Sequence, residues 1–156
     1  MHATINDRPV AADLKGEVTL LAFLRNVLGL NGTKRACSRG ECGACTVLLD
    51  GEPVYSCVTL ANACDGRSVR TIEGLGTTDA PHALQEAFVI EDAIQCGFCT
   101  PGQLMAAAAL LSRNDDPSDE EVVDALSGNL CRCGTYPKIV RAVRRAAVML
   151  RTSAHG

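Results

Sequence analysis

The first 72 residues alternate between apolar and polar side chains over short stretches, and this two-residue period is typical of β-strands. Two such stretches flank the turn-forming pair Asn6-Asp7, so we predict a hairpin over residues 3–14. Three more strands are predicted, at residues 46–50, from residue 54, and at residues 68–72. The pair Asp50-Gly51 is a typical turn between the first two of these.

Two stretches of the same half have a helical pattern. Residues 19–30 repeat their apolar positions with the 3.6-residue period of an amphipathic helix. The predicted apolar face consists of Leu20, Phe23, Leu24, Val27 and Leu28. Residues 58–64 are predicted to form a shorter helix. The first half therefore combines short strands with one main helix.

Beyond residue 82 the strand pattern does not recur, and only helical periodicity remains. Four helices are predicted, at residues 82–93, 101–113, 118–126 and 137–151. Three residues favour a defined start for the second one: Thr100 as N-cap, Pro101 in the first turn and Gln103 as reciprocal capping partner. The third begins with a capping box at Ser118 and Glu121. This half is predicted to be a small helical bundle.

Glycine, threonine and proline concentrate between the two halves, which is typical of a linker. We therefore predict one domain at residues 1–74, a linker at 75–81 and a second domain at 82–156. The length of 156 residues is compatible with two small domains. The fold class is α+β, with the strands confined to the first domain.

The composition narrows the class of protein. The formal net charge of −3 argues against a general nucleic-acid surface. The first residues have neither the basic nor the apolar segment of a secretory signal, and no apolar run is long enough for a membrane span. Nine cysteines in such a chain indicate metal ligands in a reducing compartment rather than disulfides. We expect a cytoplasmic protein.

The first group of cysteines has the spacing Cys37-x4-Cys42-x2-Cys45, which is that of plant-type [2Fe–2S] ferredoxins. The intervening glycines suit a loop that wraps closely around a cluster, because glycine tolerates positive φ. Cys57, which follows Cys45 after eleven intervening residues, is the candidate fourth ligand.

The second group lies in the predicted helical domain. Cys96 and Cys99 form a CxxC pair, which alone is compatible with zinc, a redox dithiol or half of an iron–sulfur site. Cys131 and Cys133 form a CxC pair, which is a poor zinc knuckle because alternate residues of an extended chain point to opposite faces. Eight of the nine cysteines thus form two sets of four. The ninth, Cys64, lies among apolar residues and is predicted to be a small core side chain.

The sequence resembles the small iron–sulfur subunit of the molybdenum hydroxylases, the xanthine oxidase family. The resemblance rests on Thr33-Lys34, Cys37, GECGACTV at residues 40–47, QCGFCTPG at 95–102 and GNLCRCG at 128–134. It covers nearly the whole chain. It implies a ferredoxin-like β-grasp domain followed by a four-helix-bundle domain, each with one [2Fe–2S] cluster. Ala36 and Ser38-Arg39 depart from the usual pattern, but neither departure affects a ligand.

The resemblance also implies a function and partners. Electrons would pass from a molybdopterin-bearing large subunit through the two clusters to an FAD-binding medium subunit, in a heterotrimer or its dimer. The helical-domain cluster would lie nearer the molybdenum, where Gln95 and Cys133 would contact the cofactor. Hydroxylation would take place on another chain, so no catalytic residue is expected here. A free-standing two-cluster ferredoxin-like carrier and a zinc-stabilised interaction module are the alternatives.

Overall fold

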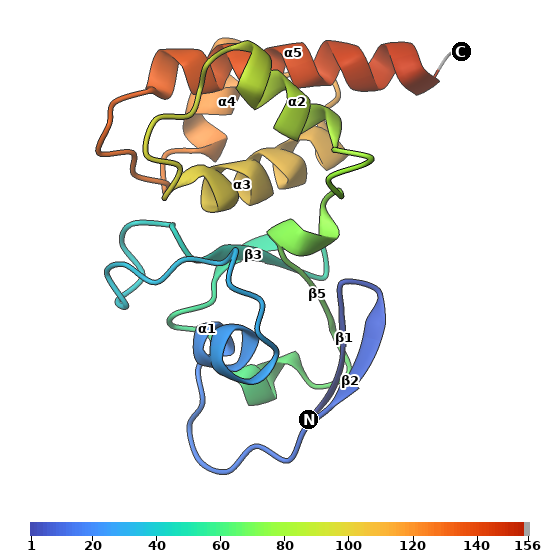
Figure 1. Cartoon of the computed structure of the whole chain (residues 1–156), viewed down its shortest axis with the longest axis vertical. Helices are drawn as coiled ribbons and strands as arrows, with labels where there is room; N and C mark the ends of the chain where they lie inside the picture. Colours follow the sequence, from blue (N-terminus) through green and yellow to red (C-terminus); the bar gives the residue numbers. More distant parts are fainter. Residues whose placement is uncertain (155–156) are drawn as a thin grey trace.

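The computed structural model describes residues 1–154, so the last two residues of the predicted second domain lie outside the described residues. A β-sheet domain and a helical domain lie one above the other (Figure 1). The first hairpin is confirmed: β1 (His2–Ile5) and β2 (Arg8–Ala11) are antiparallel, and their turn holds Asn6 and Asp7 at φ of 49° and 62°. The hairpin ends at Ala11, before the predicted limit at residue 14.

The sheet has five strands in the order β2-β1-β5-β3-β4. Strands β3 (Thr46–Leu49) and β4 (Glu52–Tyr55) form the second antiparallel hairpin, and β5 (Ser68–Arg70) lies between β3 and β1. Strand β5 is parallel to β1, which brings the two ends of the domain together. The predicted strand at 68–72 is too long, because the Asn6 side chain accepts the Thr71 N–H at 2.8 Å in place of a ladder bond. The 3₁₀ turn η3 (Ile72–Gly74) follows.

The predicted helix at 19–30 requires the largest correction. It consists of a short α-helix, α1 (Leu20–Ala22), continued by a π-helical turn, η1 (Phe23–Val27). In this wider turn Val27, which we placed on the apolar face, is 63% exposed, whereas Leu28 still packs against the core. Leu20 and Leu24 do reach the core beneath the sheet. The predicted helix at 58–64 is only a 3₁₀ turn, η2 (Ala61–Cys64).

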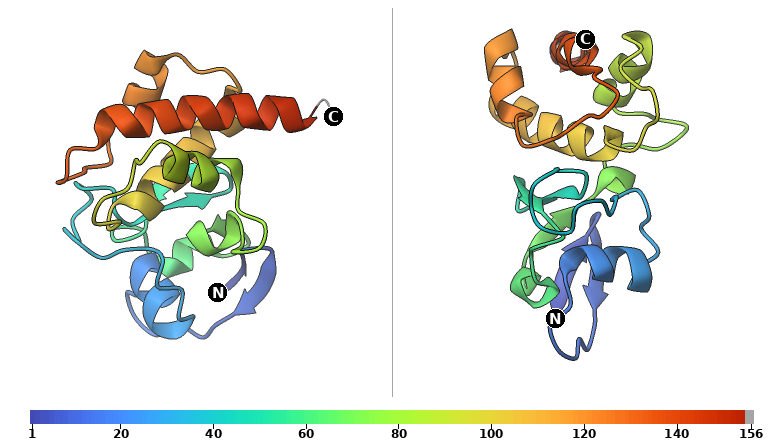
Figure 2. Two further views of the ribbon diagram at one scale, coloured as in Figure 1. Left: turned by 45° about the horizontal axis from the view of Figure 1, so that its top comes forward. Right: turned by 90° about the vertical axis from the view of Figure 1, so that its left-hand side faces the viewer.

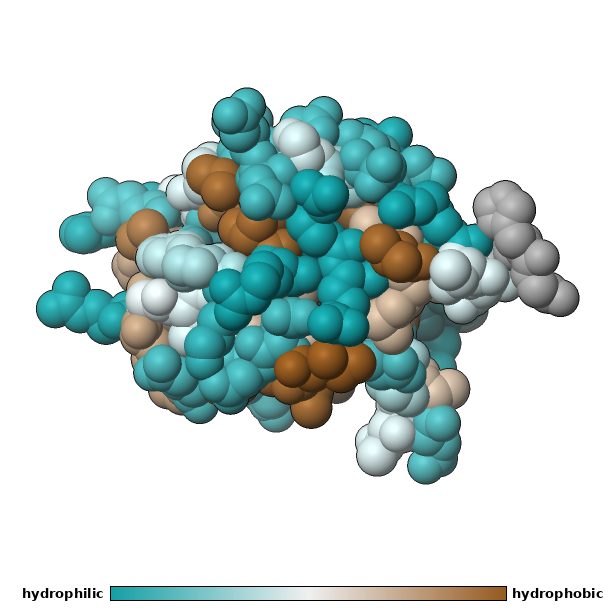
Figure 3. Space-filling view, turned by 90° about the horizontal axis from the view of Figure 1, so that it is seen from above, coloured by the Kyte–Doolittle hydropathy of each residue, from teal (hydrophilic) through white to brown (hydrophobic). Residues whose placement is uncertain are grey.

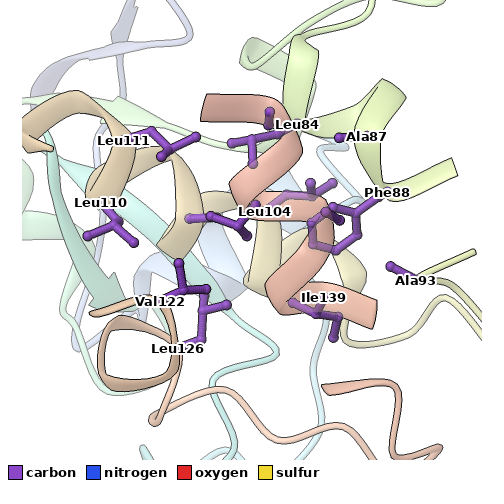
Figure 4. Packing of buried hydrophobic residues seen from close by; sticks show 14 of the residues in the cluster. Leu84, Ala87, Phe88, Ala93, Leu104, Leu110, Leu111, Val122, Leu126 and Ile139 are labelled. Carbon is purple, nitrogen blue, oxygen red and sulfur yellow. The ribbon is translucent and has the colours of Figure 1, made fainter. Parts of the chain in front are cut away.

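Four helices form the second domain, as predicted: α2 (Ala83–Ile90), α3 (Thr100–Arg113), α4 (Asp119–Ala125) and α5 (Tyr136–Ala154). Their shared core includes Phe88, Leu104, Val122 and Ile139, which point toward one another (Figure 4). Helix α3 lies between α5 and the sheet in all three ribbon views, so it is the element that joins the layers (Figure 2). None of the helices described is long and apolar enough to cross a lipid bilayer.

Helix capping was predicted correctly in one case and wrongly in another. Ser118 and Glu121 form the expected capping box of α4. In α3, however, Cys99 is the N-cap, no side chain caps the helix, and Thr100 is its first residue. Gln103 is fully buried and donates to the Asn129 carbonyl at 2.8 Å, so it is not available for capping. His82 caps α2, an arrangement that the sequence pattern did not suggest.

Candidate iron–sulfur centres

The cysteine-rich loop of the sheet domain is shaped to present backbone N–H groups to sulfur. Residues 36–42 form consecutive bends that lead into a turn at 44–45, and Ser38, Gly40 and Gly43 of this loop have positive φ. The Glu41 N–H approaches the Cys37 sulfur at 3.5 Å. Backbone N–H groups of Arg39, Glu41 and Cys42 lower the pKa of Cys37 to about 6. Such donors stabilise thiolates, which are the ligand form that iron requires.

The four thiols of this domain form two neighbouring pairs. Cys37 lies beside Cys42, whose side chain contributes to lowering the pKa of Cys37. Cys45 lies beside Cys57, and both are buried. Burial raises the pKa of Cys45 to about 11, and the adjacent Cys57 thiol adds to the effect. Two close pairs are the arrangement that two irons need when each takes two thiolates.

The thiols of the helical domain show the same pairing. Cys99 lies beside Cys131, and Cys96 lies beside Cys133. Burial, together with the neighbouring Cys131, raises the pKa of Cys99 to about 12. Burial alone would raise the pKa of Cys131. Hydrogen bonds from Thr135 and other groups outweigh burial and lower this pKa to about 7. The CxxC and CxC loops thus contribute one thiol each to both pairs.

Two residues that the sequence pattern did not single out support the CxC loop. The Thr135 hydroxyl lies 3.2 Å from the Cys131 sulfur, and the Cys131 N–H donates to the Tyr136 hydroxyl at 2.7 Å. Both residues directly follow the CxC motif, and this position is the feature of the sequence from which their role could have been predicted. Over residues 1–154, no three His, Cys, Asp or Glu side chains converge on one point as a single metal ion would require. The donor set, eight thiols in four pairs, fits two-iron clusters.

Comparison with known proteins identifies both domains. Residues 3–69 match the family described as a 2Fe-2S iron–sulfur cluster binding domain, and residues 71–144 match a second family described as a [2Fe-2S] binding domain. The chain is 52% identical to one of the nicotinate dehydrogenase subunits of Pseudomonas putida, over 92% of this chain and 91% of that protein. This chain belongs to the small iron–sulfur subunits of the molybdenum hydroxylases. It is therefore an electron-transfer subunit with two [2Fe–2S] domains, and the free-standing carrier is not supported.

Two further relatives agree with this family. The nicotine 6-hydroxylase small subunit of Paenarthrobacter nicotinovorans is 54% identical, over 87% of this chain and 81% of that one. The crystal structure of quinoline 2-oxidoreductase from Pseudomonas putida 86 has a TM-score of 0.92 at 44% identity, with 97% of this chain and 95% of that chain covered. Both the two-domain fold and the membership in an oxidoreductase are thus confirmed.

The remaining predicted site residues lie at the surface or in the core. Gln95 and Cys96 are exposed, and Cys133 is half-buried. Cys64 is fully buried in the core of the sheet domain, with its sulfur 3.8 Å from the Leu60 carbonyl oxygen. Burial raises the pKa of Cys64. Its prediction as a core side chain is confirmed.

Proposed function

We propose that this iron–sulfur subunit carries electrons, one at a time, from a molybdopterin-bearing large subunit to an FAD-binding medium subunit. The proposed cluster ligands are Cys37, Cys42, Cys45 and Cys57 in the first domain and Cys96, Cys99, Cys131 and Cys133 in the second. The observation that carries this assignment is the pairing of these eight thiols. When bound, the clusters supply one-electron chemistry. The chain supplies thiolates, N–H donors and burial, which set the cluster potentials.

A protein contact at the second ligand set is supported by exposed apolar side chains beside its cysteines. Phe98, between Cys96 and Cys99, is 45% exposed, and Leu130, next to Cys131, is 57% exposed. Apolar side chains around a partly exposed site suit a protein–protein contact that excludes water. We therefore assign the large subunit to the helical-domain loops and the medium subunit to the sheet-domain cluster.

The outer face of α5 is less suitable than the helical-domain loops as a contact surface for the large subunit. Arg141 and Arg145 both pair with Glu91, and Arg144 pairs with Asp119, so these charges are matched within the chain. Figure 3 shows small hydrophobic groups on this face, separated by hydrophilic side chains. It is therefore assigned to solvent.

Metal analysis and co-purification test the proposal. The complex, purified from its native host, should contain about four irons and four acid-labile sulfides per copy of this chain, as two Cys₄ clusters require. The reduced protein should give two EPR signals. The large and medium subunits should copurify, the first with molybdopterin and the second with FAD, in a heterotrimer or its dimer. Stoichiometric zinc without an EPR signal would refute the cluster assignment, and a complex without flavin would refute only the medium subunit.

We further propose that Gln95 and Cys133 contact the molybdenum cofactor in the complex. The exposed Gln95 amide offers both donors and an acceptor, which suits the mixed edge of a pterin. Gln95→Ala should slow reduction of the helical-domain cluster, which receives electrons first, or weaken cofactor retention. Both clusters should stay assembled. Rapid-freeze EPR with substrate measures this, with the exposed Glu86→Ala on α2 as control. Unchanged cluster reduction and molybdenum content would refute a contact by Gln95.

Three finer assignments complete the proposal. The domains are placed at residues 1–74 and 82–156, and the location is cytoplasmic. The substrate of the large subunit is proposed to be a nitrogen-containing heteroaromatic ring, because nicotinate, nicotine and quinoline appear in the names of the relatives. The purified complex should then reduce an artificial dye with such rings. Turnover of aldehydes alone would refute this substrate class.

A further inference from the structure

The two cluster-bearing loops are joined by direct hydrogen bonds between the domains. The Leu130 N–H, one residue before Cys131, donates to the Cys42 carbonyl oxygen at 2.9 Å. The Tyr55 hydroxyl, at the end of β4, donates to the Gly128 carbonyl oxygen at 3.0 Å. One ligand of each set is thus adjacent to the same hydrogen bond. In Figure 1 the cysteine loops of both domains lie on the same side of the molecule, at the left.

Asn129 lies at the centre of this contact. Its side chain is buried, and its Nδ2 group donates to the Gly43 carbonyl oxygen at 2.9 Å and to the Thr46 hydroxyl at 3.1 Å. Its own backbone carbonyl accepts the Gln103 amide at 2.8 Å. Asn129 therefore connects the cysteine loop of the sheet domain, the CxC loop and α3. A buried donor that loses its partner is costly, so these bonds define one relative position.

Three glycines allow the loops to approach so closely. A β-carbon at Gly43 would overlap the Gly128 carbonyl oxygen, and one at Gly102 would overlap the Gly43 carbonyl oxygen. A β-carbon at Gly128 would overlap the Tyr55 hydroxyl. We call Gly43, Tyr55, Gly102, Gly128 and Asn129 the interdomain seam.

Apart from the exposed ion pair between Arg113 of α3 and Glu52 of β4 at 2.7 Å, the rest of the domain interface is less directional. Leu48 of the sheet packs against Met105 and Ala109 of α3, and such apolar contact tolerates sliding. Farther along, a cavity of about 430 Å³ opens between the domains, lined in part by Arg70, His82 and Ser112. The hydrogen bonds of the seam are therefore the contacts that fix how the two ligand loops sit relative to each other.

We propose that Asn129 is a positioning residue that sets the separation and orientation of the two clusters, and so the electronic coupling between them. This rests on the proposed cluster ligands. Electron transfer and the magnetic interaction between two paramagnetic centres both depend steeply on separation. The hydrogen bonds of the Asn129 side chain go to Gly43 and Thr46 and not to a ligand sulfur. Asn129 therefore acts through the loops that carry the ligands.

The test is low-temperature EPR of the fully reduced complex, in which two nearby reduced clusters split each other's signals. Asn129→Ala should reduce this splitting and slow electron transfer between the clusters, with iron content and both individual signals retained. Tyr55→Phe removes a single interdomain bond and should produce a smaller change of the same kind. Asn6→Ala is the matched control, because Asn6 also makes two side-chain hydrogen bonds, both to Thr71 within the sheet domain. Its splitting should equal that of the wild type.

Three outcomes would overturn the inference. The first is an unchanged splitting in Asn129→Ala and Tyr55→Phe. The second is an equal change in Asn6→Ala, which would mean that general destabilisation is responsible. The third is loss of a cluster in Tyr55→Phe, which would mean that the seam is needed to retain a cluster and does not merely set the distance between the two. Failure of the proposed cluster assignment is distinct, because the wild-type complex would then give no cluster signals at all, and failure of the proposed partners would show as their absence from the purified wild-type complex.

Discussion

Replacing Phe88 by alanine should destabilise the helical domain selectively. Phe88 is 1% exposed in the core between α2 and α5 (Figure 4). Its carbonyl oxygen also accepts the Ala93 N–H at 2.9 Å, which directs the chain toward Cys96. Truncating a buried phenylalanine costs about 3–5 kcal/mol, compared with about 5–15 kcal/mol of total stability for a typical protein. The variant should therefore lose the helical-domain cluster first.

The assay is the rate at which each cluster's EPR signal disappears at a fixed urea concentration. Cluster release makes unfolding irreversible, so a rate is the quantity to compare. If the transition state for unfolding has lost the Phe88 contacts, a destabilisation of about 3 kcal/mol accelerates loss of the helical-domain cluster by about a hundredfold. The first cluster should be lost later.

Val89→Ala is the matched control, because Val89 is the next residue of α2 and is 71% exposed. Its effect should lie within about 0.5 kcal/mol, as is usual for surface substitutions. Equal acceleration in both variants would contradict the assignment of Phe88 to the core. Simultaneous loss of both clusters in Phe88→Ala would show that the two domains unfold as one unit.

Other substitutions test individual residues. Cys57→Ser should abolish or alter one of the two EPR signals, whereas Cys64→Ser should keep both, and cluster loss in the latter would show that the fourth ligand is misassigned. Hydrogen bonds from Arg145 and Arg141 lower the pKa of Glu91 from its ordinary value of 4.5, so this contribution to stability is present above pH 4.5 and is lost as the pH falls through the folded pKa. Glu91→Gln should flatten that acid dependence in thermal denaturation, and an identical pH profile would contradict the pairing. Ser118→Ala removes the cap of α4, a loss of about 1 kcal/mol, and should accelerate loss of the helical-domain EPR signal at a fixed urea concentration several-fold; slower loss would rule out the cap.

Local patterns predicted the elements whose residues decide their own conformation. The turn at Asn6-Asp7 requires positive φ, which asparagine and aspartate tolerate, and the hairpin follows from it. The capping box of α4 is equally local. The eight paired cysteines could also be chosen from spacing and resemblance, although their assignment as ligands stays a prediction.

Elements that depend on distant residues were predicted less well. Strand β5 stops at Arg70 because of Asn6, more than sixty residues away. Gln103 has the right position for a capping box, but the Asn129 carbonyl binds its amide instead. Val27 has helical spacing, yet the π-helical turn moves it to the surface. No periodicity predicts such contacts, because they form only when two separate segments meet.

The close approach of Gly43, Gly102 and Gly128 limits how electron-transfer parts can be exchanged between enzymes. A chimaera joined at the linker would combine ligand loops from different parents. Any side chain larger than hydrogen at these positions would then meet the backbone or tyrosine of the other domain. The linker is therefore a poor junction, and the sheet and helical domains should be transplanted together as one electron-transfer unit.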